Sequence, residues 1–277
     1  MSTKQGPTER SPERMVMAGV VWLLGLGVVV LGARQVLPPL ASAHGMGIDR
    51  MLTYLLVTTG ILVLVGHVVL GYFILRFSGR ARASSDLPVA RAERIWAVVP
   101  AVVMTLVAEG GVLVIGLPVW GQLYGSIAPA DAVVVEVTAE QFTWNVRYPG
   151  QDGQFGRTDP RLISTENPIG LDAGDPAAGD DILDLAVIHL PVNRPAHVRL
   201  RSKDMLHSFY LPNHRIKQDA VPGMTIDLWF VPTREGEFEF ACAEICGFGH
   251  YQMRGTLKVV SEDEFSDWLS EESVTAE

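Results

Sequence analysis

The run MLTYLLVTTGILVLVGHVVLGYFIL, Met51–Leu75, contains no Asp, Glu, Lys or Arg and lies between Arg50 and Arg76. A helix needs ~20 apolar residues to cross the ~30 Å hydrocarbon layer of a bilayer, and a helix in a soluble core rarely stays apolar on every face for this length. The run therefore predicts a transmembrane helix and places the chain among membrane proteins.

Two further apolar runs lie on either side of this one. The run IWAVVPAVVMTLVAEGGVLVIGL, Ile95–Leu117, predicts a second transmembrane helix. The run MVMAGVVWLLGLGVVVLGA, Met15–Ala33, follows a basic tail and precedes an ASA triplet at Ala41–Ala43 that resembles a signal-peptidase site. It is either a signal peptide or a third, uncleaved helix. The chain is therefore predicted to have three parts. Residues 1–43 contain the cytoplasmic tail and the signal peptide or extra helix, residues 44–122 form a transmembrane hairpin, and residues 123–277 form an exterior domain.

The charges around the runs predict the orientation of the chain. The loop between the second and third runs carries five arginines against two acids: Arg76, Arg80, Arg82, Arg91 and Arg94 against Asp86 and Glu93. Cytoplasmic loops of membrane proteins carry an excess of Lys and Arg, so this loop is cytoplasmic and the chain after about residue 120 lies outside. Both interpretations of the first run give this topology, which predicts a multi-pass protein of a plasma (inner) membrane, bacterial in type.

The exterior part differs in charge and pattern from the first part. From Ser126 onward it carries 25 acidic residues and 12 Lys plus Arg, a formal charge of −13, whereas the first 125 residues carry 6 acidic and 10 basic residues. Such a domain either steers a basic partner or is acidic only for solubility. Short runs rich in Val, Ile, Thr and aromatics, such as AVVVEVTAEQFTWNVRYP, predict strands of a small sandwich or Greek-key barrel.

Two segments of the exterior part do not have the strand pattern. Gly150–Asp184 is rich in Gly, Asp and Pro without periodicity and predicts a surface loop, whose acids either are simply solvated or help to dock a basic donor. The tail SEDEFSDWLSEE has Ser261 and Glu264 at capping-box spacing, which predicts a short terminal helix. The chain has no basic patch and no phosphate-cradling glycine loop, so no nucleic-acid partner is expected.

The stretch CAEICGFGHYQM, Cys242–Met253, contains both cysteines of the chain. An exterior compartment favours a disulfide by default, but a bond between cysteines four residues apart would close a very tight loop. His250 and Met253 follow within the stretch, and His207 lies upstream in DMLHS. Thiolate, imidazole and thioether ligands together select copper, and two bridging thiolates can hold two coppers, so copper is favoured over a disulfide or zinc.

These residues resemble the dinuclear copper (CuA) centre of cytochrome c oxidase subunit II. The resemblance covers nearly all of the chain from about residue 45 and includes a two-helix hairpin, C-x-E-x-C, ERIWAVVP, DMLHS and KQDAVPG at Lys217–Gly223. It implies a transmembrane hairpin followed by a cupredoxin-like Greek-key domain. It also implies electron transfer from a c-type cytochrome or similar donor to haem in oxidase subunit I, where oxygen is reduced and protons are pumped.

The resemblance implies a role for each matching residue. Cys242 and Cys246 would bridge both coppers, His207 and His250 would each ligate one, and Met253 would be a weak ligand. Glu244 would contribute its backbone carbonyl, and its side chain matches the family residue that reaches a magnesium at the boundary with subunit I. The other histidines are expected to be structural or surface residues.

The chain departs from the family pattern at the place where electrons arrive. The family has two tryptophans in the strand before the copper site, whereas this chain has QFTW, with Phe142 in place of the first and Trp144 matching the second. The resemblance therefore predicts that the entry route of electrons, or even the donor itself, differs from that of the family. No CxxCH is present, so no haem c is attached to this chain, and the cysteines argue against quinol as the direct donor.

Four further ionisable residues stand out. Glu93 matches a family Glu near the mouth of a proton path into subunit I, or is a solvated acid at a helix start. Asp204, beside His207, is a candidate for docking the donor. His67 and Glu109 lie within apolar runs, where an ionisable side chain is a functional candidate, although packing roles are favoured for both.

Three functions remain in view. The favoured one is subunit II of a haem-copper oxidase. The same copper module in a nitric oxide reductase is the first alternative. A membrane-tethered copper-binding or delivery protein without electron transfer is the second.

Overall fold

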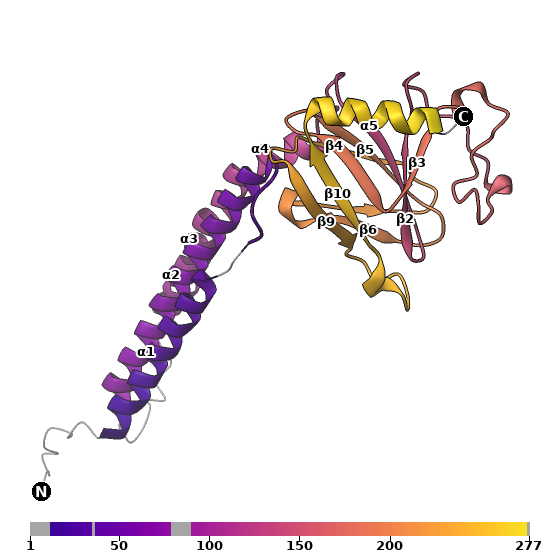
Figure 1. Ribbon diagram of the computed structural model, residues 1–277. Helices are drawn as coiled ribbons and strands as arrows, with labels where there is room; N and C mark the ends of the chain where they lie inside the picture. Colours follow the sequence, from indigo (N-terminus) through magenta and orange to yellow (C-terminus); the bar gives the residue numbers. More distant parts are fainter. Residues whose placement is uncertain (1–11, 35–36, 79–89, 276–277) are drawn as a thin grey trace, which may run out of the picture. The chain divides into compact units, whose positions relative to one another are not determined.

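The computed structural model describes residues 12–34, 37–78 and 90–275 (Figure 1). It divides into two units. One contains the described part of Met1–Leu37 together with Asp49–Leu117, and the other contains Pro38–Ile48 together with Pro118–Glu277 as far as the chain is described. The first unit is helical and the second is a β-sandwich, as the patterns predict.

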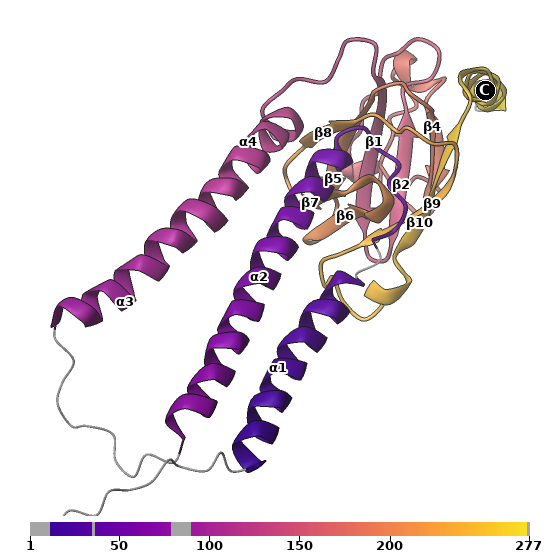
Figure 2. The same ribbon diagram turned by 90° about the vertical axis from the view of Figure 1, so that its left-hand side faces the viewer.

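The helical unit follows the three apolar runs (Figure 2). Within the described residues, three helical spans are long and apolar enough to cross a membrane: Pro12–Ala33, Gly45–Phe77 and Glu93–Tyr124. The first two are helices α1 and α2; the third consists of α3 (Ala90–Val103), the π-helix η1 (Met104–Glu109) and α4 (Gly110–Tyr124). Trp22 of α1 donates a hydrogen bond to the Val68 carbonyl of α2 at 3.4 Å.

The exterior unit is built from two five-stranded sheets, in the strand orders β3-β2-β1-β5-β8 and β4-β10-β9-β6-β7 (Figure 1). The strands of the first sheet are β1 (Val133–Glu140), β2 (Thr143–Tyr148), β3 (Ile182–Leu185), β5 (Ala196–Ser202) and β8 (Ile226–Phe230). Those of the second are β4 (Val187–Pro191), β6 (His207–Leu211), β7 (Ile216–Ala220), β9 (Gly236–Cys242) and β10 (Arg254–Val260).

Side chains of both sheets meet in one core. Val135, Val137 and Leu200 of the first sheet and Phe240 and Leu257 of the second are fully buried. The terminal helix α5 (Glu262–Thr275) forms as the capping-box spacing predicts, with the Ser261 hydroxyl accepting from the Glu264 amide at 3.2 Å. Its Trp268 stacks on His189 of β4, with ring centroids 4.3 Å apart.

The outer face of the first sheet is covered as well. Glu136 and Arg147 point away from the core, yet each is only 3% exposed. Arg147 contacts Glu136 at 2.8 Å and Asp181 at 3.2 Å, and donates to the Gly156 carbonyl at 2.8 Å. The Gly150–Asp184 segment is therefore anchored onto the sheet through a buried ion-pair network.

The aspartates of this segment hold its own backbone. Asp159 and Asp175 cap short 3-10 turns, and the Asp180 carboxylate accepts from the amides of Gln151 and Asp152 at 2.6 and 2.9 Å. Such capping satisfies donors that would otherwise lack partners. These aspartates therefore stabilise the backbone of the segment. The sequence alone suggests only that they are solvated or that they dock a donor.

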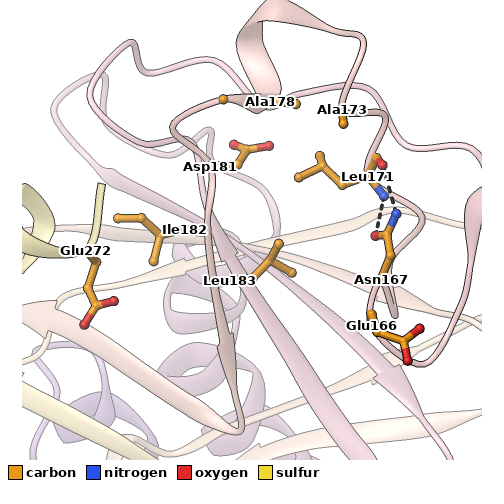
Figure 3. A pocket seen from close by; sticks show the side chains of 10 residues that line it. Glu166, Asn167, Leu171, Ala173, Ala178, Asp181, Ile182, Leu183 and Glu272 are labelled. Atoms are coloured by element: carbon orange, nitrogen blue, oxygen red, sulfur yellow. Dashed lines mark hydrogen bonds between the residues drawn. The ribbon is translucent and has the colours of Figure 1, made fainter. Parts of the chain in front are cut away.

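A cavity of about 530 Å³ lies beside this segment (Figure 3). Its walls carry carboxylates, an amide and aliphatic groups, from residues that include Glu166, Asn167, Leu171, Asp181, Leu183 and Glu272. It has no Cys, His or Met in its lining, so the candidate copper ligands lie elsewhere.

The ASA triplet belongs to the exterior unit. Ala41 and Ser42 are buried, the Ala41 amide donates to Asn213 O at 2.8 Å, and the Thr233 amide donates to Ala41 O at 2.9 Å. Ser42 forms an isolated antiparallel bridge with Pro232, so the backbone of this segment is paired to the sandwich at one point.

Candidate metal centre

The pairing of β6 with β9 brings distant ligands together. Phe209 of β6 lies opposite Cys242 of β9, so His207, at the start of β6, comes beside Cys242, at the end of β9. The chain then loops back to β10 in the gold segment at the end of these strands (Figure 1). The amide of Cys242 donates to Met253 O at 2.9 Å and closes this loop.

The sulfur and nitrogen atoms form one compact cluster. The two sulfurs, Cys242 Sγ and Cys246 Sγ, lie 3.9 Å apart, and both cysteines are free. His207 Nδ1 lies 3.9 Å from Cys242 Sγ, and His250 Nδ1 lies 3.7 Å from Cys246 Sγ. Met253 Sδ is 3.7 Å from Cys246 Sγ, and Glu244 O is 3.1 Å from Cys242 Sγ.

The structure thus brings together all six residues that the sequence proposes as ligands. Two sulfurs lie side by side, each with an imidazole nitrogen next to it, so both offer donor atoms to the same metal centre. Thiolate, imidazole and thioether are soft or borderline ligands, which suit copper and exclude Mg²⁺ or Ca²⁺ at this position. The donor set therefore fits a copper centre.

Most of the cluster is buried. Cys246 and His207 are fully buried, Met253 is 1% exposed and Cys242 is 8% exposed, whereas His250 is half-buried. Burial, and then the neighbouring Cys242 thiol, raise the pKa of Cys246 to about 11. Because metals bind thiolate, loading of this site releases protons and is favoured as the pH rises.

Asp204 orients the buried imidazole. Its carboxylate lies 2.8 Å from His207 Nε2, so the ring donates Nε2–H to the acid and turns the lone pair of Nδ1 toward the sulfurs. Burial pushes the pKa of Asp204 upward, but hydrogen bonds from His207, Gln141 N and Met205 N outweigh it, and the pKa lies below its ordinary value. Asp204, which the sequence suggests as a docking residue, is thus a hydrogen-bond partner of the candidate ligand His207.

The QFTW stretch lies against the metal loop. Gln141 Nε2 donates to Cys246 O at 2.6 Å. The Phe142 ring packs so closely on Gly249 that a Cβ there would lie 2.5 Å from it, and Phe142 remains 36% exposed. Trp144 is fully buried, with its ring centroid 6.2 Å from that of His207. Of the two aromatics, only Phe142 connects the surface to the loop.

The contacts of Gln141 with Cys246 O and of Asp204 with His207 were not predicted from the sequence. The i,i+3 spacing of Asp204 and His207 was a signal for the second, whereas nothing in the local sequence links Gln141 to Cys246. Glu93 lies in the first turn of α3, in the helical unit, and the side chain of Glu244 is half-buried.

Comparisons with known proteins agree on one family. The family model of the cytochrome c oxidase subunit II periplasmic domain matches residues 133–260. An alternative cytochrome c oxidase subunit 2 of Bradyrhizobium diazoefficiens is 36% identical, over 95% of this chain and 94% of the relative. A cytochrome c oxidase subunit 2 of Cereibacter sphaeroides is 32% identical, over 84% of this chain and 78% of the relative.

Among solved structures, the periplasmic domain of subunit II of cytochrome oxidase from Bradyrhizobium japonicum is similar to this chain. The match has a TM-score of 0.41 at 26% identity and covers 55% of this chain and 100% of that one.

Proposed function

Because the chain belongs to the cytochrome c oxidase subunit II family, we propose that it receives electrons at a dinuclear CuA centre and passes them to haem in subunit I of the oxidase complex. The chain is a subunit of an oxidoreductase complex, with apolar helices followed by a cupredoxin-like domain. Oxygen reduction and proton pumping would occur in subunit I. One observation carries the copper assignment: two free cysteine sulfurs 3.9 Å apart, each beside an imidazole nitrogen.

The residues of the cluster have distinct proposed tasks. Cys242 and Cys246 would hold the centre through their thiolates, His207 and His250 would each supply an imidazole, and Met253 and the Glu244 carbonyl would complete the ligand set. A dinuclear copper centre supplies reversible one-electron transfer with the electron shared between two metals. The chain's own contribution is a buried, strand-supported frame that changes little when the charge changes.

Three other tasks are proposed outside the ligand set. Phe142 connects the surface to the metal loop and so marks where a c-type cytochrome or similar donor gives up its electron, assisted by the acidic charge of the exterior part. The Glu244 side chain is proposed to reach a magnesium ion at the boundary with subunit I. Glu93 is proposed to serve a proton path into subunit I.

We also propose that the first apolar run stays attached as a third membrane helix, in a plasma membrane with the sandwich outside. The contacts of the ASA triplet support this, because cleavage after Ala43 would strip a buried, backbone-paired segment from the exterior unit.

The test is spectroscopic. The purified oxidase complex is assayed for copper content and by EPR, with the variants Cys246→Ser and Cys242→Ser. Each variant is expected to lose the mixed-valence signal and oxygen consumption while circular dichroism shows an intact sandwich. Ser208→Ala, which changes a buried neighbour of His207 that supplies no ligand, is the control and should keep the signal.

Two results would contradict the proposal. A single-copper spectrum in the wild-type complex would rule out a dinuclear centre, and full oxidase activity in Cys246→Ser would rule out its role. Consumption of nitric oxide in place of oxygen would identify the reductase alternative.

A further inference from the structure

The cavity beside the Gly150–Asp184 segment is lined by charge of one sign. Its charged lining residues are Glu166 and Asp181 of the segment and Glu272 of α5, and none of its described lining residues is basic (Figure 3). The surroundings add to this imbalance, because the segment carries eight acids against two arginines and α5 carries six acids and no Lys or Arg. Such a field attracts cationic ligands.

One oxygen of the Asp181 carboxylate lacks a partner at the cavity. Oδ2 accepts from the Arg147 guanidinium at 3.2 Å and from the Gly156 amide at 2.9 Å. The side chain is fully buried, yet Oδ1 has no hydrogen-bond partner among the described residues. Burial raises the pKa of Asp181, although Arg147 opposes this effect. Buried carboxylate oxygens are normally hydrogen-bonded, so a donor for Oδ1 has to come from outside the described chain.

The acids of the cavity are spaced too widely for one metal ion. Ca²⁺ gathers six to eight oxygens at ~2.3–2.6 Å around one point. Among the described residues, only His207, Cys242 and Cys246 bring three donor atoms of His, Cys, Asp or Glu within 4.8 Å of one another. Figure 3 shows Glu166 and Glu272 on opposite sides of the lining. A ligand that reaches more than one of these carboxylates is therefore extended.

The lining between the carboxylates is largely aliphatic. It includes Leu171, Ile182 and Leu183, of which Leu183 is 42% exposed. The Asn167 amide is already occupied, because its Nδ2 donates to Leu171 O at 2.9 Å and its Oδ1 accepts from Leu171 N at 2.8 Å. The cavity thus offers separated anionic groups joined by apolar surface. Its volume of about 530 Å³ lies within the range of ~300–1,000 Å³ that is usual for small-molecule sites.

We propose that this cavity binds a small aliphatic polyamine. Its ammonium groups pair with the carboxylates of Asp181, Glu166 and Glu272, and its methylene chain lies on Leu171 and Leu183. An alkylammonium group has N–H donors and no acceptor, so it supplies the donor that Asp181 Oδ1 lacks. The apolar surface that the methylenes cover adds to the affinity. This binding goes beyond the proposed electron transfer and does not depend on it.

Calorimetric titration of the purified oxidase complex with spermidine, at constant ionic strength, tests the proposal. One spermidine is expected to bind per chain. Butylamine, which has one ammonium group, should bind roughly tenfold more weakly, because two further ion pairs are lost. Spermidine that does not bind to the wild-type complex, or one Ca²⁺ per chain that displaces it from the same site, would overturn the proposal.

Charge variants locate the binding. Glu166→Gln and Glu272→Gln are each expected to weaken spermidine binding by about 2–5-fold, as for exposed ion pairs. Asp181→Asn should weaken it further, with circular dichroism showing an intact sandwich. Glu239→Gln removes an exposed carboxylate of β9 outside the cavity and should leave the affinity unchanged. Equal weakening by Glu239→Gln would mean diffuse attraction to the acidic domain and would contradict a defined site.

A steric variant tests the cavity without changing any charge. Ala173 is exposed and lines the cavity, so Ala173→Phe should occupy the space and weaken spermidine binding by roughly tenfold or more. Wild-type affinity in Ala173→Phe would place the ligand elsewhere. The copper EPR signal should be the same with and without spermidine, so a failure of the proposed function and a failure of this site are recognised separately.

Discussion

The Asp204 carboxylate holds the Nε2 side of the His207 ring at 2.8 Å, while Nδ1 of the same ring lies 3.9 Å from Cys242 Sγ. One residue thus fixes both the tautomer and the direction of a buried ligand. The acid is held in turn by the amides of Gln141 and Met205, each at 2.7 Å, so it has little freedom to turn toward a docking protein.

Asp204→Asn is therefore expected to weaken copper binding by ~10–100-fold, the range found when a group that orients a metal-bound histidine is removed. Competition against a copper chelator, followed by absorbance, measures this. Asp227→Asn removes a similar but exposed carboxylate, 2.8 Å from the half-buried His197, and is the matched control. Unchanged copper affinity with slower electron uptake in Asp204→Asn would favour docking instead.

Phe142→Ala is expected to slow electron uptake from a reduced c-type cytochrome without lowering copper content, because its partly exposed ring packs directly on Gly249 of the metal loop. Stopped-flow reduction of the complex measures the rate. Tyr210→Ala removes an aromatic of similar exposure, 39% against 36%, and should leave the rate unchanged. Equal rates in wild type and Phe142→Ala would place the route elsewhere.

Arg147→Ala is expected to destabilise the exterior unit by about 3–5 kcal/mol, because it leaves the buried carboxylates of Glu136 and Asp181 without their shared cation. Urea unfolding of the full chain in detergent, followed by tryptophan fluorescence, measures the change. Arg157→Ala breaks an exposed pair with Asp172 and should have no measurable effect. Similar losses in both variants would mean that the Gly150–Asp184 segment is not anchored by the buried network.

Stability is expected to fall in mild acid because of His214. Burial, and then the charges of His44 and Arg215, lower its pKa from 6.5 to about 4. Between these values the unfolded chain takes up a proton that the folded chain does not, so stability decreases as the pH falls through this window, by on the order of 3 kcal/mol.

His214→Leu should therefore reduce the slope of unfolding free energy against pH between about 6.5 and 4. Measurement at pH 8, where His214 is neutral in both states, separates this effect from any change in packing against Phe230 and Phe238. A slope equal to that of the wild type would mean that the ring is solvated in the folded chain.

Much of this molecule follows from local patterns. The apolar runs, the arginine-rich loop and the alternating strand residues are properties of short stretches, and the bilayer and the core act on them wherever the stretches lie. The chemical types of the ligands could also be inferred from the sequence, because four of the candidate side-chain ligands lie within Cys242–Met253.

The remaining features depend on contacts between distant residues. Pairing of β6 with β9 brings His207 to the cysteines, and Gln141 reaches Cys246 across 105 positions of sequence. The backbone hydrogen bonds of Ala41–Ala43 and the burial of Arg147 likewise arise from segments that meet only in the folded chain.

By itself, the sequence determined the long apolar helices, the β-rich part that follows them and the kinds of ligand offered to a metal, because each depends on residues close together along the chain. Tertiary structure alone decided that the sulfurs lie 3.9 Å apart, that Asp204 serves His207 and that the loop acids hold backbone amides. The physical reason is that strand register and burial set these distances, and both are properties of the packed chain.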